Sequence, residues 1–353
     1  MPITASILGA SGYGGGELYR WLLQHPRVER IQGVAHSQAG VAVAKVHPQL
    51  RGLVDGPFAA EVDWAALAAS EQPVLFAALP HGEFARRYGD LTEEIAANGL
   101  NDRLTIIDLS GDFRLRDPAA FALAYGGEHP CPQYLDDFVY GLADWQPARL
   151  QGARRIANPG CFATAVALGL LWLAALPASL RPKPVAVSAI TGSSGSGIKP
   201  SETTHHPARA HDFRAYKPLQ HQHRFEVSAA AVAAGWQPDW SLVTHSAPLV
   251  RGIHATLQFP AGAITAADLD QACAQAFGDQ RFVRRVDAPP RLAAVNGSNF
   301  VDIGAALADG HGTVLVALDN LGKGMASQAI QNMNLALGLP ADLGLRVAAP
   351  IPG

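Results

Sequence analysis

The chain has 353 residues, which is too long for one ordinary hydrophobic core and predicts about two domains. Its 48% hydrophobic and 16% charged residues are typical of a globular protein and argue against a disordered or membrane-embedded chain. The formal net charge is -3 and the lysines and arginines are scattered singly, which argues against a nucleic-acid partner.

The sequence contains no pattern typical of a targeting signal or a membrane span. Met1 leads almost directly into a strand pattern, and the longest apolar run, about 165–176, is shorter than the roughly 20 residues of a membrane helix. Cys131, Cys161 and Cys273 are too widely spaced for a disulfide framework or a zinc pattern. We expect a cytoplasmic protein in which any thiol chemistry belongs to one cysteine.

The first predicted elements are a strand at 4–8, a glycine-rich turn and a helix at about 17–24. Glycines in such a turn let the backbone approach a pyrophosphate, whose charge faces the helix N-terminus. A flexible turn without a ligand is the alternative, but the strand before and the helix after favour a dinucleotide site. The predicted cofactor contacts are Gly9, Ser11, Gly12, Tyr13, Gly14 and Gly15.

Further short apolar runs at 31–35, 74–79 and 104–109 alternate with helix-compatible stretches. This alternation predicts a parallel sheet with helices on both faces, that is, an α/β Rossmann domain. The second run ends in Ala35-His36-Ser37-Gln38, with no acidic residue to bind a ribose 2′-hydroxyl. The missing carboxylate favours NADPH over NADH, with Ser37 among the cofactor contacts.

Cys161 follows Asn158-Pro159-Gly160 and opens a strongly apolar helix that Pro177 ends at about residue 176. A sulfur at a helix start lies among backbone N–H groups that stabilise a thiolate, and the thiolate is the nucleophile. The alternative is a buried cysteine that acts as a small hydrophobe, which suits Cys131 and Cys273.

A long polar stretch at 191–223 lies among strand candidates at 185–190, 247–259 and 313–318, and the last predicted helix is 326–337. The glycine-rich start of this stretch, with Ser193 and Gly195, is either an anion-binding nest near the nicotinamide or a plain linker.

His221 and His223 end this stretch, and an imidazole suits proton transfer at neutral pH. Solvated, non-catalytic histidines are the alternative. His205, His206 and His211 are interpreted as surface residues, and no metal is expected because no cysteine or carboxylate stands at ligand spacing.

With these features in place, the sequence resembles the N-acetyl-γ-glutamyl-phosphate reductase family of arginine biosynthesis over nearly its whole length. The matching motifs are Gly9-Ala10-Ser11-Gly12-Tyr13, Ala78-Leu79-Pro80-His81-Gly82, Asp108-Leu109-Ser110-Gly111-Asp112-Phe113-Arg114, Tyr140-Gly141-Leu142, Asn158-Pro159-Gly160-Cys161 and Asp319-Asn320-Leu321-Gly322-Lys323-Gly324.

The resemblance implies an NADP-binding Rossmann domain over 1–157 and 320–353, with a returning C-terminal helix. It implies a catalytic and oligomerisation domain of the semialdehyde dehydrogenase type over 158–319, and a homo-oligomer, either a dimer or a tetramer. It also implies NADPH as the hydride donor, with Pro80 and Asn320 as cofactor contacts, and substrate contacts from Asn158, Arg114 and Arg251.

In the chemistry that the resemblance implies, Cys161 displaces phosphate from the acyl phosphate and forms a thioester, which is reduced to N-acetyl-glutamate semialdehyde. His221 is the first choice for proton transfer and His223 the second, with Glu226 as the orienting carboxylate.

Arg224-Phe225 replaces the family's usual Thr-Pro, and Gln222 replaces a common arginine. The stretch 204–218 is more similar to sister reductases whose substrates are attached to an acidic carrier protein. Arg209, Arg214 and Lys217 suit such a carrier, although a solvated polar surface explains them equally well. Aspartate-semialdehyde dehydrogenase and a non-catalytic dinucleotide sensor are the rival interpretations.

Overall fold

The computed structural model describes residues 1–351, and the chain forms two compact units. Unit 1 contains 1–159 and 325–346, and unit 2 contains 160–324 and 347–351. The chain therefore leaves unit 1 after residue 159 and re-enters it at residue 325. The boundaries expected from the sequence lay after residue 157 and at residue 320, and residues 347–351 were assigned to the first domain, whereas these residues belong to unit 2.

Unit 1 is built on a six-stranded sheet in the order β2-β1-β3-β4-β6-β5, and every neighbouring pair is parallel. Its strands are β1 (Ile3–Leu8), β2 (Val28–Val34), β3 (Gln72–Ala77), β4 (Thr105–Asp108), β5 (Val139–Tyr140) and β6 (Arg155–Ala157). The predicted parallel sheet is confirmed, and the four apolar runs correspond to β1–β4. The last two strands are too short to have a sequence signal of their own.

The α-helices of unit 1 are α1 (Tyr13–Leu22), α2 (Val43–Val46), α3 (Trp64–Ala69), α4 (Glu83–Ala97), α5 (Pro118–Tyr125) and α10 (Ser327–Ala336). Short 3-10 turns occur at His36–Gln38, Pro48–Leu50, Pro132–Asp137 and Pro147–Leu150. All ten residues of α10 are buried, and the helix packs against α1 and β4. The predicted helix at 326–337 is confirmed, whereas the predicted helix at 17–24 was placed too late, because α1 already begins at Tyr13 within the glycine run.

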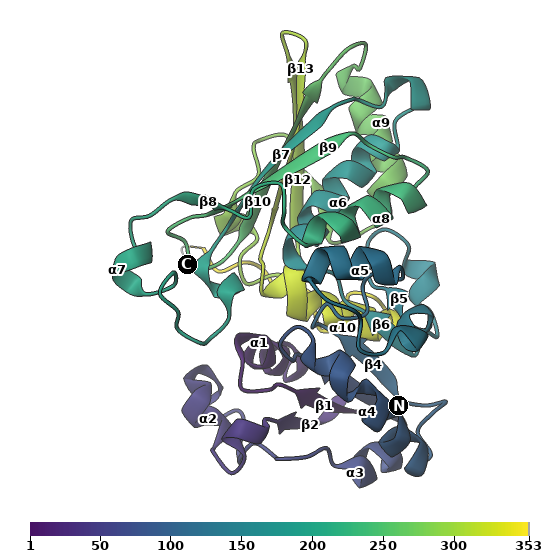
Figure 1. The fold of residues 1–353 in the computed structure, drawn as a ribbon, viewed down its shortest axis with the longest axis vertical. Helices are drawn as coiled ribbons and strands as arrows, with labels where there is room; N and C mark the ends of the chain where they lie inside the picture. Colours follow the sequence, from purple (N-terminus) through teal and green to yellow (C-terminus); the bar gives the residue numbers. More distant parts are fainter. Residues whose placement is uncertain (352–353) are drawn as a thin grey trace. The chain divides into compact units, whose positions relative to one another are not determined.

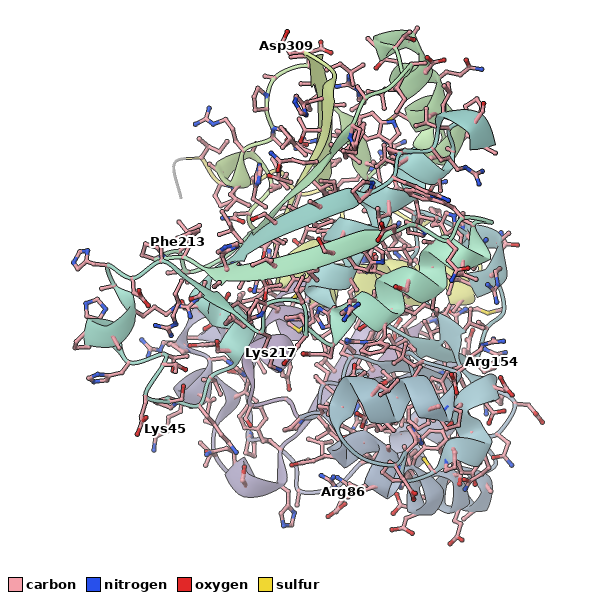
Figure 2. All side chains as sticks on the ribbon, turned by 45° about the horizontal axis from the view of Figure 1, so that its top comes forward. Lys45, Arg86, Arg154, Phe213, Lys217 and Asp309 are labelled. Atoms are coloured by element: carbon pink, nitrogen blue, oxygen red, sulfur yellow. The ribbon has the colours of Figure 1, made fainter. Side chains whose placement is uncertain are left out.

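Unit 2 contains a mixed seven-stranded sheet in the order β11-β12-β13-β10-β7-β9-β8. Its strands are β7 (Val185–Thr191), β8 (Arg214–Tyr216), β9 (Trp240–Ser246), β10 (Ile253–Pro260), β11 (Val283–Arg285), β12 (Val301–Ala308) and β13 (His311–Leu318). The β7–β9 and β11–β12 pairs are parallel and the other pairs are antiparallel. Figure 2 shows Asp309 at the tip of the hairpin that joins β12 to β13.

The predicted strand at 247–259 was wrong in its first half. Residues 247–252 form an irregular loop because Leu249 and Val250 face solvent and Gly252 has a φ of 108°. The strands β9 and β12 were not predicted, since their serines, glycine and alanines do not form an apolar run.

The α-helices of unit 2 are α6 (Cys161–Ala174), α7 (His206–Arg209), α8 (His223–Ala233) and α9 (Ala266–Phe277). Short 3-10 turns occur at Ala178–Leu180, Ser193–Ser196 and Leu292–Ala294, and a π turn at Gly322–Ala326 leads into α10. Figure 1 shows α6, α8 and α9 together on one side of the sheet, and α6 packs against α8, α9 and β10. In the described residues, no helix combines the length and the apolar character that a membrane crossing requires.

Candidate active site

Cys161 is the first residue of α6, as predicted. Gly160 precedes it as the N-cap in an extended conformation, and no side chain caps the helix. A side chain at this position lies at the positive end of the helix dipole, which favours negative charge on the sulfur. The other 13 residues of the helix are buried, whereas Cys161 is half-buried. Cys161 thus combines a rigid position with access from solvent.

The other two cysteines have a different environment. Cys131 and Cys273 are buried, and their burial raises the pKa of each thiol to about 11. A thiol with such a pKa carries almost no thiolate at neutral pH. Both fit the alternative of a small hydrophobic side chain.

Two side chains of α8 surround the residue before the cysteine. Glu226 is fully buried, and its Oε2 accepts a hydrogen bond from the backbone N–H of Gly160 at 3.0 Å. The imidazole of His223 packs against Gly160 so closely that a Cβ at residue 160 would lie 2.4 Å from Nε2. The Nε2 atom also lies 3.9 Å from Oε1 of Glu226. Glycine at 160 is therefore what allows the imidazole to reach the start of α6.

Gly324 makes a similar close approach to the cysteine itself. A Cβ at residue 324 would lie 2.8 Å from the Cβ of Cys161. The motif Asp319–Gly324, which the sequence suggested only by resemblance, therefore ends directly against the cysteine. Any side chain at 324 would displace Cys161.

His221 is buried and points its imidazole into an aromatic environment. Its ring meets those of Phe162, His223 and Tyr216 in T-shaped geometry, with centroid distances of 5.2, 4.7 and 5.9 Å. Its Nδ1 accepts a hydrogen bond from the backbone N–H of His223 at 3.2 Å. Burial, and then the charges of His223 and Lys217, lower the pKa of His221 to about 3. The imidazole is therefore neutral at physiological pH.

Tyr216 is a neighbour that sequence reasoning did not identify. It lies on β8, and burial followed by the charge of the Cys161 thiolate raises the pKa of its phenol. Its ring packs against both Phe162 and His221. No local motif marks it, because only the folded chain brings β8 to the start of α6.

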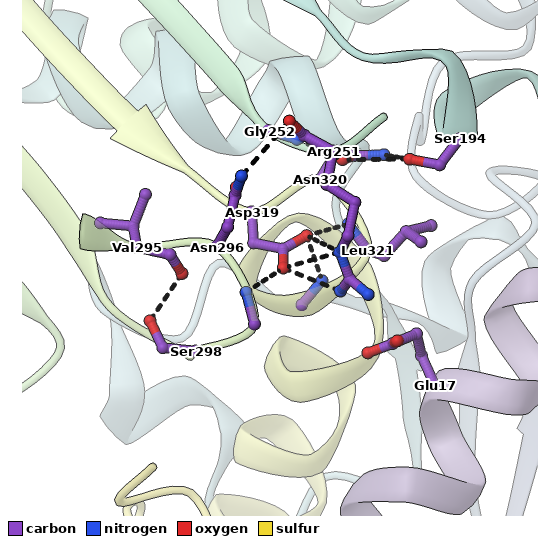
Figure 3. A network of polar contacts seen from close by, with 12 residues as sticks. Glu17, Ser194, Arg251, Gly252, Val295, Asn296, Ser298, Asp319, Asn320 and Leu321 are labelled. Atoms are coloured by element: carbon purple, nitrogen blue, oxygen red, sulfur yellow. Dashed lines mark hydrogen bonds and ion pairs between the residues drawn. The ribbon is translucent and has the colours of Figure 1, made fainter. Parts of the chain in front are cut away.

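Asp319 and Asn320 directly follow β13, and their side chains form hydrogen bonds with neighbouring loops of unit 2 (Figure 3). The buried carboxylate of Asp319 accepts hydrogen bonds from the Arg251 guanidinium, with Nη2 at 2.8 Å, and from the N–H groups of Leu321 and Gly322. Arg251, a predicted substrate contact, thus has a carboxylate partner within unit 2. Asn320 and Ser194 are joined by their side chains at 3.0 Å, and Asn320 Oδ1 accepts the Gly252 N–H at 2.8 Å.

These bonds fix the 3-10 turn that carries Ser193 and Gly195. The N–H of Ser193 donates to the carbonyl of Leu249 at 2.7 Å, and a Cβ at Gly195 would meet no atom closer than 3.6 Å. The turn is therefore an anchored element rather than a plain linker, and a methyl group at 195 would make only ordinary van der Waals contacts there.

The other two predicted substrate contacts, Arg114 and Asn158, lie in unit 1. The Arg114 guanidinium donates to the carbonyls of Asn158 and Leu109 at 2.7 and 3.0 Å. Asn158 is fully buried; its Nδ2 donates to the carbonyl of Met325, and its Oδ1 accepts from the amide of Asn332. These contacts hold the loop after β6, and they point to a positioning role for both side chains.

The glycine turn of unit 1 fits a dinucleotide. Gly9 has a φ of 76°, and a Cβ there would lie 2.4 Å from the carbonyl oxygen of Ala78. A Cβ at Gly15 would lie 2.2 Å from the carbonyl oxygen of Ala10. Gly12 is the N-cap of α1 and has no side-chain cap, so the first N–H groups of the helix are open to a pyrophosphate. These close approaches and the open helix end are what a bound dinucleotide needs.

Ser11 and Tyr13 lie in the same turn, with Tyr13 exposed at the first position of α1 and Gly14 following it. Ser37 lies in the turn after β2 and Pro80 in the loop after β3, the two strands that flank β1. Both are therefore at the carboxyl edge of the sheet, where open α/β sheets bind ligands. His47, which sequence reasoning missed, supports the turn through its Nε2 at 2.8 Å from the carbonyl of Ala10.

In the described part of the chain, no group of three or more histidine, cysteine or acidic residues is arranged to hold a metal ion.

Comparisons with known proteins give a consistent family assignment. Residues 4–153 match the semialdehyde dehydrogenase NAD-binding domain, and residues 161–320 match the semialdehyde dehydrogenase dimerisation domain. Among similar sequences, the putative [LysW]-L-2-aminoadipate 6-phosphate reductase of Thermomicrobium roseum is 40% identical, with 98% of each chain covered. The [LysW]-L-2-aminoadipate 6-phosphate reductase of Deinococcus radiodurans is 39% identical, with 97% of this chain and 96% of that one covered.

The N-acetyl-gamma-glutamyl-phosphate reductase of Frankia casuarinae is 38% identical, with both chains fully covered. Among solved structures, aspartate semialdehyde dehydrogenase II of Vibrio cholerae has a TM-score of 0.64 at 16% identity, with 95% of this chain and 98% of that one covered. At that identity the likeness concerns the fold alone.

Proposed function

We propose that this chain, which belongs to the semialdehyde dehydrogenase family, is an NADPH-dependent reductase that converts an acyl phosphate into an aldehyde through a thioester on Cys161. One observation carries the proposal. Cys161 is the half-buried residue at the start of a helix whose other residues are buried, and an imidazole and a carboxylate lie against the residue before it.

The first step is the attack of the Cys161 thiolate on the carbonyl carbon of the acyl phosphate. The carbon–sulfur bond forms, the carbon–oxygen bond to the phosphoryl group breaks, and inorganic phosphate leaves. We infer that the N–H groups at the start of α6, which no side chain caps, donate hydrogen bonds to the developing oxyanion. Bound NADPH supplies the hydride that reduces the resulting thioester. Breaking the carbon–sulfur bond then frees the aldehyde and regenerates the thiolate.

We infer that His223, rather than His221, moves the proton of the thiol. The imidazole of His223 contacts Gly160 and lies near the Glu226 carboxylate, which stabilises an imidazolium. His221 is buried, and its pKa of about 3 makes it a poor proton acceptor. This assignment reverses the order expected from the sequence, in which His221 came first.

Glu226 then has two roles at once. It orients the His223 imidazole, and it fixes the backbone of Gly160 through the N–H group. Because one carboxylate contacts both groups, it holds the His223 imidazole and the backbone before Cys161 in a fixed relative position.

The first candidate substrate is N-acetyl-γ-glutamyl phosphate, with N-acetyl-glutamate 5-semialdehyde as the product. It is supported by the relative from Frankia casuarinae, because the similarity extends over the full length of both chains. The test is the reverse reaction. With the semialdehyde and NADP⁺, NADPH formation should require inorganic phosphate. Phosphate-dependent activity with aspartate semialdehyde and none with the acetylated compound would assign the chain to aspartate-semialdehyde dehydrogenase chemistry instead.

The second candidate is the same reaction on an aminoadipyl or glutamyl phosphate attached to an acidic carrier protein. Two of the relatives above have names that refer to [LysW]-linked substrates, and the segment after β7 carries the exposed Lys217, whereas Arg209 is buried. A steady-state comparison of free and carrier-linked substrate decides between the candidates through kcat/KM. A non-catalytic sensor, by contrast, would bind NADPH and turn over neither compound.

We also infer a cytoplasmic homo-oligomer. The match of residues 161–320 to a dimerisation domain supports the oligomer. The cysteines are free thiols, which supports a reducing compartment. Sedimentation of the purified chain checks the oligomeric state.

A further inference from the structure

Arg209 is a buried cation without a partner among the described residues. It ends α7 and is only 9% exposed. Its Nε and Nη2 atoms are buried, and neither makes a hydrogen bond. An arginine at such a site keeps its charge, because its guanidinium cannot be deprotonated in proteins. A buried charge with no partner costs free energy, so the site lacks an acceptor for the Arg209 guanidinium.

A neighbouring arginine shows what an ordinary surface arginine does in the same segment. Arg214 forms an ion pair with Asp212 and donates to the carbonyl of Thr203, and its side chain is 36% exposed. The Asp212 carboxylate is therefore already paired with Arg214. The charges of Arg214, Tyr216 and Asp212 act on Arg209, but the Asp212 carboxylate forms its ion pair with Arg214.

Tyr216 connects Arg209 with the candidate active site inside unit 2. The charges of both Arg209 and the Cys161 thiolate act on the Tyr216 phenol. The Tyr216 ring also packs against His221, which in turn packs against Phe162 beside the cysteine. The unpaired guanidinium is thus in the neighbourhood where a substrate that reacts at Cys161 must bind.

We propose that Arg209 is a specificity-determining residue that binds an oxyanion of the substrate, either the phosphoryl group or a carboxylate. The inference rests on the proposed function, because it assigns the anion to the substrate of Cys161. Both anions accept two parallel hydrogen bonds from a guanidinium, and the two free donors of Arg209 can supply them. Binding of the anion would provide the missing partner.

The reverse reaction separates the two sources of the anion, because phosphate and semialdehyde are then separate substrates. In Arg209→Met, we expect the KM of one of them to rise by about 10- to 100-fold, the usual scale for a lost charge-assisted hydrogen bond. A selective rise for phosphate assigns the site to the phosphoryl group, and a selective rise for the semialdehyde assigns it to the carboxylate.

Two further variants make the result specific. Arg209→Lys keeps the charge but loses the planar pair of donors, so its KM should fall between those of the wild type and Arg209→Met. Arg214→Met removes an equal charge from the exposed, paired neighbour and should leave both KM values within about twofold, as expected for surface charges. Unchanged KM values in Arg209→Met, or equal effects of Arg209→Met and Arg214→Met, would overturn the proposal. If Arg209→Met does not fold, the comparison of Arg209→Lys with the wild type takes its place.

A binding measurement without turnover keeps this test separate from the proposed function. Inorganic phosphate and N-acetylglutamate are added in turn at constant ionic strength, and the shift in Tm is recorded for wild type, Arg209→Met and Arg214→Met. At least one probe should stabilise the wild type and Arg214→Met but not Arg209→Met. Equal shifts in all three proteins would overturn the anion site, whether or not the enzyme assay succeeds. An inactive wild type that keeps the selective shift would instead contradict the proposed function alone.

Discussion

Cys161 is the residue on which the proposed chemistry depends. It could be predicted from the sequence because a Pro-Gly turn followed by a long apolar run indicates a helix start. The pair His221 and His223 could also be found from the sequence, but the sequence could not show which of the two moves the proton. Which imidazole approaches Gly160 depends on how α8 packs against α6, and no local pattern contains that information.

We expect Cys161→Ala to abolish turnover while NADPH binding is retained. The sulfur is the nucleophile, whereas the predicted dinucleotide turn lies in unit 1. Activity is measured by NADPH oxidation and binding by fluorescence titration. Cys273→Ala is the matched control, since that thiol is buried with a raised pKa. Wild-type turnover in Cys161→Ala would end the covalent proposal.

Replacing the two histidines should separate their roles. His223→Asn should lower kcat by about 10²-fold or more, the usual scale for a lost acid–base group. His221→Asn should have a smaller effect on kcat, because the His221 imidazole is buried and already neutral. A larger loss in His221→Asn than in His223→Asn would restore the order suggested by the sequence.

The low pKa of His221 also predicts a pH dependence of stability. The folded pKa is about 3, below the ordinary value of 6.5, so the unfolded chain binds the proton between these pH values. The contribution of His221 therefore falls as the pH drops below about 6.5, with a slope of at most about 1.4 kcal/mol per pH unit.

Denaturant unfolding of wild type and His221→Gln from pH 7 to pH 4.5 checks this dependence. The other titrating groups are common to both proteins, so the difference in the free energy of unfolding isolates His221. We expect the wild type to lose more stability than the variant over this range. Parallel curves would show that His221 is not buried in its neutral form.

At the scale of elements, the packing of α8 against α6 brings His223 and Glu226 to the start of the helix that carries Cys161. Glycine at 160 is required there by space rather than by backbone conformation, since its φ is an ordinary -68° and its Cβ would meet the His223 ring. The sequence shows the glycine but not the reason for it. The same holds for Gly324, whose neighbour Cys161 is distant along the chain.

Gly160→Ala should lower kcat by about 10²-fold without unfolding the protein, because a displacement of about 1 Å in a catalytic group has that effect. The added methyl group would push the imidazole away from the start of α6. Activity and the circular dichroism spectrum are measured together. Gly89→Ala, in α4 with open space around its Cβ, is the control and should keep full activity. Full activity in Gly160→Ala would show that the close approach of His223 does not matter for turnover.

At the scale of the whole molecule, the most informative element is α10. Its sequence has four amide side chains, at 328, 331, 332 and 334, and would suit a solvent-exposed helix, yet all ten of its residues are buried in unit 1. The amides find partners far away in the chain, for example Gln331 with Asp144 and Asn334 with His25. Pattern reasoning places the helix, but only the family resemblance suggested that it returns to the first domain.

Asn332→Ala should lower the free energy of unfolding by about 1–3 kcal/mol, the cost of leaving buried polar groups unsatisfied. Its Nδ2 donates to the carbonyl of Gly141 and to Oδ1 of Asn158. Denaturant unfolding of the variant is compared with that of Asn101→Ala, an exposed amide that should have almost no effect. Equal stability of the two variants would show that α10 does not tie unit 1 together.

The most direct test of the central claim is the intact mass of the protein after mixing with N-acetyl-γ-glutamyl phosphate in the absence of NADPH. A thioester on Cys161 should add one N-acetylglutamyl group per chain and release one equivalent of phosphate, and the addition should map to the peptide that contains residue 161. It should be absent in Cys161→Ser and disappear when NADPH is added. Phosphate release without a covalent adduct, or an adduct on Cys131 or Cys273, would contradict the account.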